Sequence, residues 1–190
     1  MNLPNKLTMS RLVMTALFLA VMFSQVKYHE TIALFLFSIA SLTDYFDGKI
    51  ARRDKLITNF GILMDPLADK ILVCSAFIAF VELKWMPAWM VVIIVARELA
   101  ITGLRLLAAS KNVVLAAEGY GKHKTISQIV AIIAILVLSG YPQWGDWAVT
   151  LCGWWVPTFT LIAKWVAVLL TMISGYLYLW RNREIYLSDM

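Results

Sequence analysis

The chain has 190 residues, of which 61% are hydrophobic and only 15% are charged, and its mean hydropathy is +0.76. Soluble domains carry about 45–50% apolar and about 25% charged residues, so the composition excludes an ordinary soluble domain and predicts an integral membrane protein. The net charge of +5 is then expected to serve membrane orientation and attraction to anionic lipid, and no nucleic-acid binding is predicted.

Apolar runs separated by short polar turns predict helices, each near the roughly 20 residues that cross a bilayer. In chain order they are expected over about Leu7–Val26, Thr31–Arg52, Phe60–Glu82, Pro87–Leu107, Thr125–Gly140 and Pro157–Trp180. No internal repeat or linker divides the sequence. We therefore expect an all-α integral membrane protein, a bundle of about six transmembrane helices, with residues 1–190 forming one membrane domain.

The distribution of basic residues predicts the orientation of these helices. An N-terminus in the cytoplasm places most of the basic residues on that side, namely Lys6, Arg11, Arg52, Arg53, Lys55, a loop from Arg105 to Lys124, Arg181 and Arg183. The opposite side then holds Lys27 and Lys84, beside a loop over Tyr141–Trp155 without Lys or Arg. This positive-inside pattern predicts a multi-pass protein with a cytoplasmic N-terminus.

Four aspartates at regular spacing lie in the second and third predicted helices. Asp44 and Asp47 are three residues apart and Asp65 and Asp69 are four apart, so each pair shares one helix face. Ionisable groups inside a membrane are costly and mark functional sites. A short connection favours antiparallel packing of the two helices, which would bring the four carboxylates to one pocket in the cytoplasmic half.

Four carboxylates in one pocket would repel one another strongly unless cations neutralise them. All-oxygen ligands favour hard ions such as Mg²⁺ or Mn²⁺, and two such ions about 3.5–4 Å apart suit phosphoryl chemistry. Gly48, Ala51 and Gly61 leave room for a ligand beside the backbone, and Arg52 can bind a phosphate in a bidentate way. The pattern predicts a two-metal phosphoryl-transfer site, with structural acids in a membrane bundle as the alternative.

Between Asp44 and Asp69 the residues read D-x2-D-G-x2-A-R-x8-G-x3-D-x3-D. This run is similar to the signature of the CDP-alcohol phosphotransferase family, and all eight defining positions are filled. Other parts of the chain resemble the bacterial members that use glycerol 3-phosphate, namely Asn2–Thr8 with Arg11, Thr43–Gly48, Met64–Lys70, Ala96–Glu98 and Gly121–Thr125.

The resemblance implies a transfer of the phosphatidyl group from CDP-diacylglycerol to sn-glycerol 3-phosphate, giving phosphatidylglycerol phosphate and CMP. It implies an enzyme of the bacterial cytoplasmic (inner) membrane, commonly a homodimer. Asp44, Asp47, Asp65 and Asp69 are then expected to hold two divalent cations, Mg or Mn, and Asp69 is expected to act as the general base. The residues implied as contacts to the CDP group are Gly48, Arg52, Thr58, Asn5 and Thr8.

A second set of residues indicates an anionic acceptor. Arg97 and Glu98 lie deep in the fourth predicted helix, with Arg105 two turns further on the same side, and Lys122 and Lys124 open the fifth helix. A buried Arg–Glu pair is costly unless compensated, and lysines at a helix N-terminus suit an anion. We predict that Arg97, Arg105, Lys122 and Lys124 bind the acceptor phosphate. Alternatively, Arg97 and Glu98 form a structural clamp and the lysines are ordinary cytoplasmic charges.

Two other functions remain open from the sequence. A related transferase could use serine, inositol phosphate or phosphatidylglycerol as its acceptor, although a zwitterionic amino acid would not need all of these cations. The alternative from a different class is an ion-coupled membrane transporter. Transporters more often place their acids near the midplane of inverted repeats, and the sequence shows no such repeat.

Overall fold

The computed structural model describes the backbone of residues 3–54, 59–111 and 120–187, and the side chains of residues 9–43, 70–111, 123–183 and 185–186. Within these ranges every regular element is a helix, in agreement with the predicted all-α class. The long helices are α1 (Leu3–Met22), α2 (His29–Asp54), α3 (Asn59–Glu82), α4 (Ala88–Ser110), α5 (Tyr120–Gly140) and α7 (Val156–Arg181). The short ones are η1 (Tyr141–Trp144), α6 (Asp146–Cys152) and α8 (Arg183–Leu187).

Each predicted segment coincides with one long helix, but several ends differ. α1 ends at Met22 and not at Val26, because the chain turns at Ser24, whose hydroxyl donates to the Val21 carbonyl at 2.8 Å. α4 continues to Ser110, so Arg105 lies within a helix and does not begin a loop as predicted. α5 begins at Tyr120, earlier than predicted.

The segment from Tyr141 to Trp155 was predicted to be a loop, and this prediction was wrong. It contains η1 and α6, separated by Gly145, whose φ of 103° suits glycine. The segment is held against the start of α2, since Trp144 Nε1 donates to Thr31 Oγ1 at 2.7 Å and Gln143 Nε2 donates to Glu30 Oε2 at 2.7 Å. These side-chain contacts order a stretch that lacks the apolar periodicity of a long helix.

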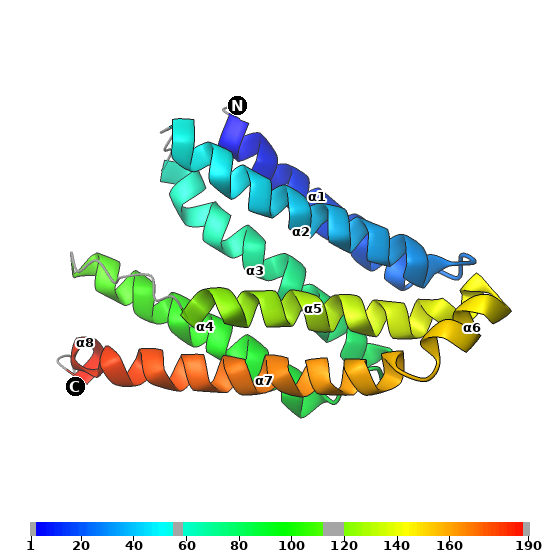
Figure 1. Ribbon diagram of the computed structural model, residues 1–190. Helices are drawn as coiled ribbons and strands as arrows, with labels where there is room; N and C mark the ends of the chain where they lie inside the picture. Colours follow the sequence, from blue (N-terminus) through cyan, green and yellow to red (C-terminus); the bar gives the residue numbers. More distant parts are fainter. Residues whose placement is uncertain (1–2, 55–58, 112–119, 188–190) are drawn as a thin grey trace.

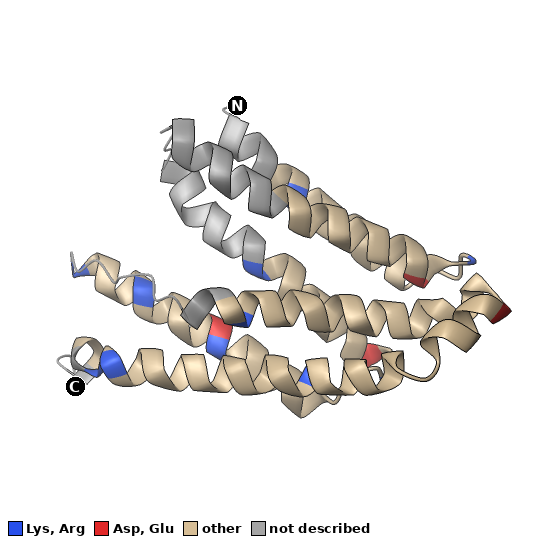
Figure 2. Ribbon diagram, in the orientation of Figure 1, with Lys and Arg blue, Asp and Glu red and all other residues tan. Residues whose placement is uncertain are grey.

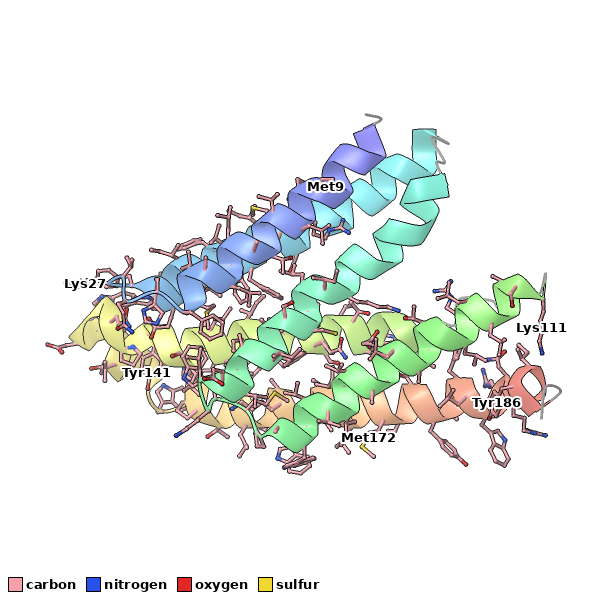
Figure 3. All side chains as sticks on the ribbon, turned by 180° about the vertical axis from the view of Figure 1, so that it is seen from behind. Met9, Lys27, Lys111, Tyr141, Met172 and Tyr186 are labelled. Atoms are coloured by element: carbon pink, nitrogen blue, oxygen red, sulfur yellow. The ribbon has the colours of Figure 1, made fainter. Side chains whose placement is uncertain are left out.

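Successive long helices run in opposite directions, so both chain termini lie at the same end of the bundle (Figure 1). Seen from behind, Lys27 and Tyr141 mark one end and Lys111 and Tyr186 the other (Figure 3). Lys and Arg are concentrated in the half that holds the termini, which we call the terminal half (Figure 2). This alternation agrees with the prediction that the connections between successive helices lie alternately at the two ends of the bundle.

Helix α5 occupies the centre of the bundle, where it packs against α7, α2 and α3. The larger cluster of buried apolar residues, which we call the apolar core, lies in the half away from the termini, the distal half. Its fully buried members include Phe18, Phe37, Phe77, Phe80, Ile132 and Leu136. The rings of Phe18 and Phe37 are 5.9 Å apart. This packing fixes α1, α2, α3 and α5 against one another on the distal side of the polar residues described below.

Among the residues that the structure describes, two helical stretches are long and apolar enough to cross a membrane, His123–Trp144 and Val156–Arg181. The outer face of α7 exposes large apolar side chains, among them Leu161, Trp165, Leu169, Met172 and Tyr176. An apolar outer face of this kind is typical of a helix that contacts lipid.

Candidate active site

A layer of polar side chains crosses the bundle on the terminal side of the apolar core. Because α1 and α2 are antiparallel, Arg11, which precedes Phe18 in α1, lies at a similar level to Ser41, which follows Phe37 in α2. The same order holds in the remaining long helices, which contribute Lys70 from α3, Glu98, Thr102 and Arg105 from α4, Lys124 and Gln128 from α5, and Thr171 and Ser174 from α7. The polar residues thus share one level, distinct from that of the apolar core.

A cavity of about 230 Å³ lies within this polar layer. Its described walls come from α1, α2, α3, α4 and α5, and the lining residues are Arg11, Ser41, Lys70, Leu72, Val73, Cys74, Glu98, Arg105, Lys124, Thr125, Gln128 and Ile129. Four of these side chains are cationic and one is anionic. The described wall therefore has an excess of positive charge, and a low-polarity enclosure strengthens the attraction of such a wall for an anion.

Glu98 is the centre of the ion pairs in this layer. Lys124 Nζ donates to Glu98 Oε1, and Arg97 Nη1 lies 3.4 Å from the same oxygen. The pair is shielded from solvent, since Glu98 is 4% exposed and Lys124 is 5% exposed. Charges at this depth are tolerated only when they are paired, so the predicted cost of a buried Arg–Glu pair is offset in part by a lysine from α5.

The main-chain carbonyl of Glu98 accepts a separate hydrogen bond, which leads to a second lysine. Thr102 lies one turn further along α4, and its hydroxyl donates to the Glu98 carbonyl at 2.7 Å. Lys70 Nζ of α3 donates to the same hydroxyl oxygen. These hydrogen bonds connect α3 to α4 at the cavity wall.

Arg97 points away from the cavity and toward α7. Its Nη2 donates to Ser174 Oγ at 3.3 Å, and a Cβ atom added to Gly175 would lie 2.7 Å from Arg97 Cγ. Arg105 was predicted to lie on the same side of α4 as Arg97 and Glu98, and the structure confirms this for Glu98 but not for Arg97. Eight residues rotate a helix about 80° past two full turns, whereas the seven residues from Glu98 to Arg105 fall about 20° short of them, so Glu98 shares the cavity with Arg105.

All of the predicted donor and metal residues lie outside the described side chains: these are Asp44, Asp47, Asp65, Asp69, Gly48, Arg52, Asn5, Thr8 and Thr58, of which Thr58 lies outside the described backbone as well. Lys122, predicted to bind the acceptor phosphate, also lies outside the described side chains. The helical backbone is continuous over 44–54 and 59–69, so each aspartate pair keeps the spacing of one helix face. Lys70, the residue after Asp69, lines the cavity, and this places the signature end of α3 beside it.

Thr102, Gln128 and Lys70 are among the residues of the polar layer that were not predicted as site residues, although each lies close in the sequence to a predicted one. Thr102 follows Glu98 by four residues and Gln128 follows Lys124 by four, so each shares a helix face with a predicted site residue. Gln128 is 2% exposed, and its Nε2 donates to Thr171 Oγ1 of α7 at 3.0 Å. Lys70 directly follows the last aspartate of the signature.

The all-helical architecture, the membrane-length apolar helices and an ionic cavity inside them define a membrane-embedded protein with an internal polar site. The model of the CDP-alcohol phosphatidyltransferase family matches residues 1–180. The chain belongs to this family, which confirms the resemblance carried by the aspartate signature.

Similar proteins come from several bacteria. The CDP-diacylglycerol–glycerol-3-phosphate 3-phosphatidyltransferase of Bacillus subtilis (strain 168) is 39% identical over 201 residues, covering 96% of this chain and 96% of the relative. A probable phosphatidylglycerophosphate synthase of Mycobacterium tuberculosis (strain CDC 1551 / Oshkosh) is 38% identical, covering 95% of this chain and 81% of the relative. A Rickettsia typhi protein named like that of Bacillus subtilis is 34% identical, covering 93% of this chain and 94% of the relative.

Proposed function

We propose that this protein transfers the phosphatidyl group of CDP-diacylglycerol to sn-glycerol 3-phosphate, forming phosphatidylglycerol phosphate and releasing CMP. The observation that carries the proposal is the complete aspartate signature on α2 and α3, next to a cavity with an excess of cationic side chains. The names of the relatives from Bacillus subtilis and Rickettsia typhi support the same reaction.

The charge of the cavity wall supports a phosphorylated acceptor. Arg105 and Lys124 line the cavity, and Lys122 lies two residues before Lys124 at the start of α5. A phosphate monoester carries up to two negative charges and matches such a wall, whereas a zwitterionic amino acid does not require it. In this proposal Arg105, Lys122 and Lys124 bind the acceptor phosphate, and Arg97 clamps α4 to α7.

Members of the family generally depend on divalent metal ions. The donor set fits such ions, because Asp44 and Asp47 on α2 and Asp65 and Asp69 on α3 offer only carboxylate oxygens, from two helices joined by a short connection. These four residues would hold two Mg or Mn ions. When bound, the ions would neutralise negative charge on the diphosphate of the donor.

The remaining roles belong to the protein's own side chains. Asp69 accepts the proton of the acceptor hydroxyl as the hydroxyl oxygen bonds to the phosphorus that carries the diacylglycerol. The bond from that phosphorus to the bridging oxygen of the diphosphate breaks, and CMP leaves with this oxygen. Contacts to the CDP group are assigned to residues near the signature and in α1, namely Gly48, Arg52, Thr58, Asn5 and Thr8.

We further infer six membrane spans, a cytoplasmic N-terminus and an active site in the cytoplasmic half of the bacterial inner membrane. The support is the alternation of six long helices, with Lys and Arg concentrated in the terminal half (Figure 2). The polar layer and its cavity lie on the terminal side of the apolar core. A homodimer is part of the proposal on family resemblance, and light scattering of the detergent-solubilised protein measures it.

The test of the reaction is CMP release from CDP-diacylglycerol by purified protein, with a panel of acceptors. We expect release with sn-glycerol 3-phosphate and little with serine, inositol phosphate or phosphatidylglycerol. Preference for another acceptor would assign the chain to a related transferase. Absence of CMP with every acceptor, together with ion-driven uptake in proteoliposomes, would favour a transporter.

A further inference from the structure

Glu98 is the one carboxylate among the described residues of the cavity wall, and it lies in a place where an anion is expected to bind. Its negative charge opposes the binding of an acceptor phosphate. By charge alone, a cavity without this acid would attract anions more strongly. The presence of Glu98 therefore indicates that it has another role in the cavity.

The hydrogen bonds of Glu98 indicate that role. Its side chain accepts from Lys124, which comes from α5, and its main-chain carbonyl accepts from Thr102 at 2.7 Å. Thr102 in turn accepts from Lys70 of α3. Lysines from two different helices are thus attached to neighbouring residues of α4, Lys124 to Glu98 and Lys70 to Thr102, and both line the cavity.

A lysine side chain has many rotamers and gains little by binding an anion if it must first be ordered. Attachment to Glu98 or Thr102 restricts these rotamers before the anion arrives. Each ammonium group has three donors, so Lys124 and Lys70 keep donors for an anion after these contacts are made. The apolar core packed on the distal side of the layer holds the helices that carry these groups.

We propose that Glu98 and Thr102 are positioning residues for the acceptor: the Glu98 carboxylate holds Lys124, and the Thr102 hydroxyl, itself bonded to the main-chain carbonyl of Glu98, holds Lys70, with both ammonium groups at the cavity wall. The inference rests on the proposed function, since it takes the acceptor to be a phosphorylated alcohol. The proposal predicts a change in acceptor affinity opposite in sign to the change that electrostatics alone would give. Removal of the Glu98 charge weakens binding of the acceptor because Lys124 is released, although the cavity becomes more positive.

The first variant is Glu98→Gln, assayed with sn-glycerol 3-phosphate and CDP-diacylglycerol as separate variable substrates. We expect the acceptor KM to rise about tenfold, as for the loss of one charge-assisted hydrogen bond, with the donor KM unchanged. Glu98→Asp keeps the charge and is expected to restore part of the loss. An acceptor KM that stays the same or falls in Glu98→Gln overturns the proposal.

A double-mutant cycle with Lys124→Ala tests whether Glu98 acts through the lysine. If Glu98 only positions Lys124, Glu98→Gln adds little to the effect of Lys124→Ala, because the group it positions is already absent. Full additivity of the two effects on the acceptor KM contradicts the mechanism.

Thr102→Val provides a second variant that changes no charge and keeps the shape of the side chain. We expect it to raise the acceptor KM severalfold through Lys70, even where Glu98→Gln does not fold. Thr160→Val is the matched control, since the Thr160 hydroxyl also donates to a main-chain carbonyl, that of Ala134 at 3.1 Å, but does not line the cavity. Equal effects of the two valine variants on the acceptor KM would show a general loss of stability and overturn the proposal.

Calorimetric binding of sn-glycerol 3-phosphate to the same proteins separates the two hypotheses. If the wild-type protein binds it without releasing CMP, the proposed reaction fails, and the weaker binding expected for Glu98→Gln and Thr102→Val still tests the positioning role. If the wild-type protein does not bind it, the positioning role fails as well. If it binds and reacts while both variants bind normally, only the positioning role fails.

Discussion

Asp69 follows Asp65 by one helical turn and directly precedes Lys70, which lines the cavity. We expect Asp69→Asn to keep its affinity for CDP-diacylglycerol and to lose turnover by about 10²–10⁴, the usual contribution of a general base. Asp44→Asn is expected to lose donor affinity as well, because Asp44 is assigned only to metal binding. Calorimetry with the donor and kcat for both variants are the measurements. A near-normal kcat in Asp69→Asn would restrict this residue to a ligand role.

Arg105 is an exposed cation of the cavity wall, seven residues after Glu98 on α4. We expect Arg105→Ala to raise the acceptor KM by about tenfold or more, because a guanidinium–phosphate contact is a strong charge-assisted interaction. The donor KM should change little. Arg183→Ala removes one positive charge from an exposed residue outside the described cavity wall and serves as the control. A similar rise in both variants would indicate an effect of net charge alone.

Helices α4 and α7 approach each other closely where Arg97 crosses Gly175. A methyl group at Gly175 would lie 2.7 Å from Arg97 Cγ, an atom near the base of the side chain that cannot move without displacing the helix or the guanidinium. The small residue on α7 therefore allows the clamp between these two helices. Ser174, the preceding residue, accepts from Arg97 Nη2 at 3.3 Å.

This contact predicts opposite outcomes for two glycines. Gly→Ala within a helix stabilises by up to about 1 kcal/mol, and Gly103→Ala on α4 should show this gain, since a Cβ atom there meets nothing within 4 Å. Gly175→Ala should instead lower stability by about 1–3 kcal/mol through overpacking. Thermal unfolding of both variants in the same detergent is the measurement. Equal Tm changes would mean that α4 and α7 are less closely packed than described.

At the scale of the whole molecule, the bundle predicts which residues are reached from each side of the membrane. Lys27 is exposed at the distal end (Figure 3), and Arg183, the first residue of α8, is exposed at the terminal end (Figure 1). In a background of Cys74→Ala and Cys152→Ala, we expect a membrane-impermeant maleimide to label Lys27→Cys in intact spheroplasts. Arg183→Cys should react only after permeabilisation. The reverse pattern would place the N-terminus outside the cytoplasm.

The proposed metal site depends on how the whole bundle is packed, because its four ligands come from two helices. Chelation should abolish CMP release, and Mg²⁺ or Mn²⁺ should restore it, since four carboxylates of α2 and α3 repel one another without cations. Activity is measured in excess EDTA and again after each ion is added back. Full turnover in EDTA would contradict the two-metal site.

The sequence by itself determined the class, the long helices and the family. Apolar length and turn residues are local properties, so the six segments were placed correctly, with errors only at their ends, as at Met22 and Tyr120. The eight positions from Asp44 to Asp69 identify the family because their spacing reflects one face of each helix. The ordering of η1 and α6 was not predictable in this way, since it depends on contacts of Gln143 and Trp144 with α2.

Only the tertiary structure decided which charged groups meet. The rotation of each helix about its axis, and the level at which neighbouring helices lie side by side, set the contacts between residues far apart in the chain. They direct Arg97 to α7, pair Glu98 with Lys124, and bring Lys70 to Thr102. Local sequence spacing shows which residues share a helix face, but not which neighbour that face contacts, because the choice is made by packing of the whole bundle.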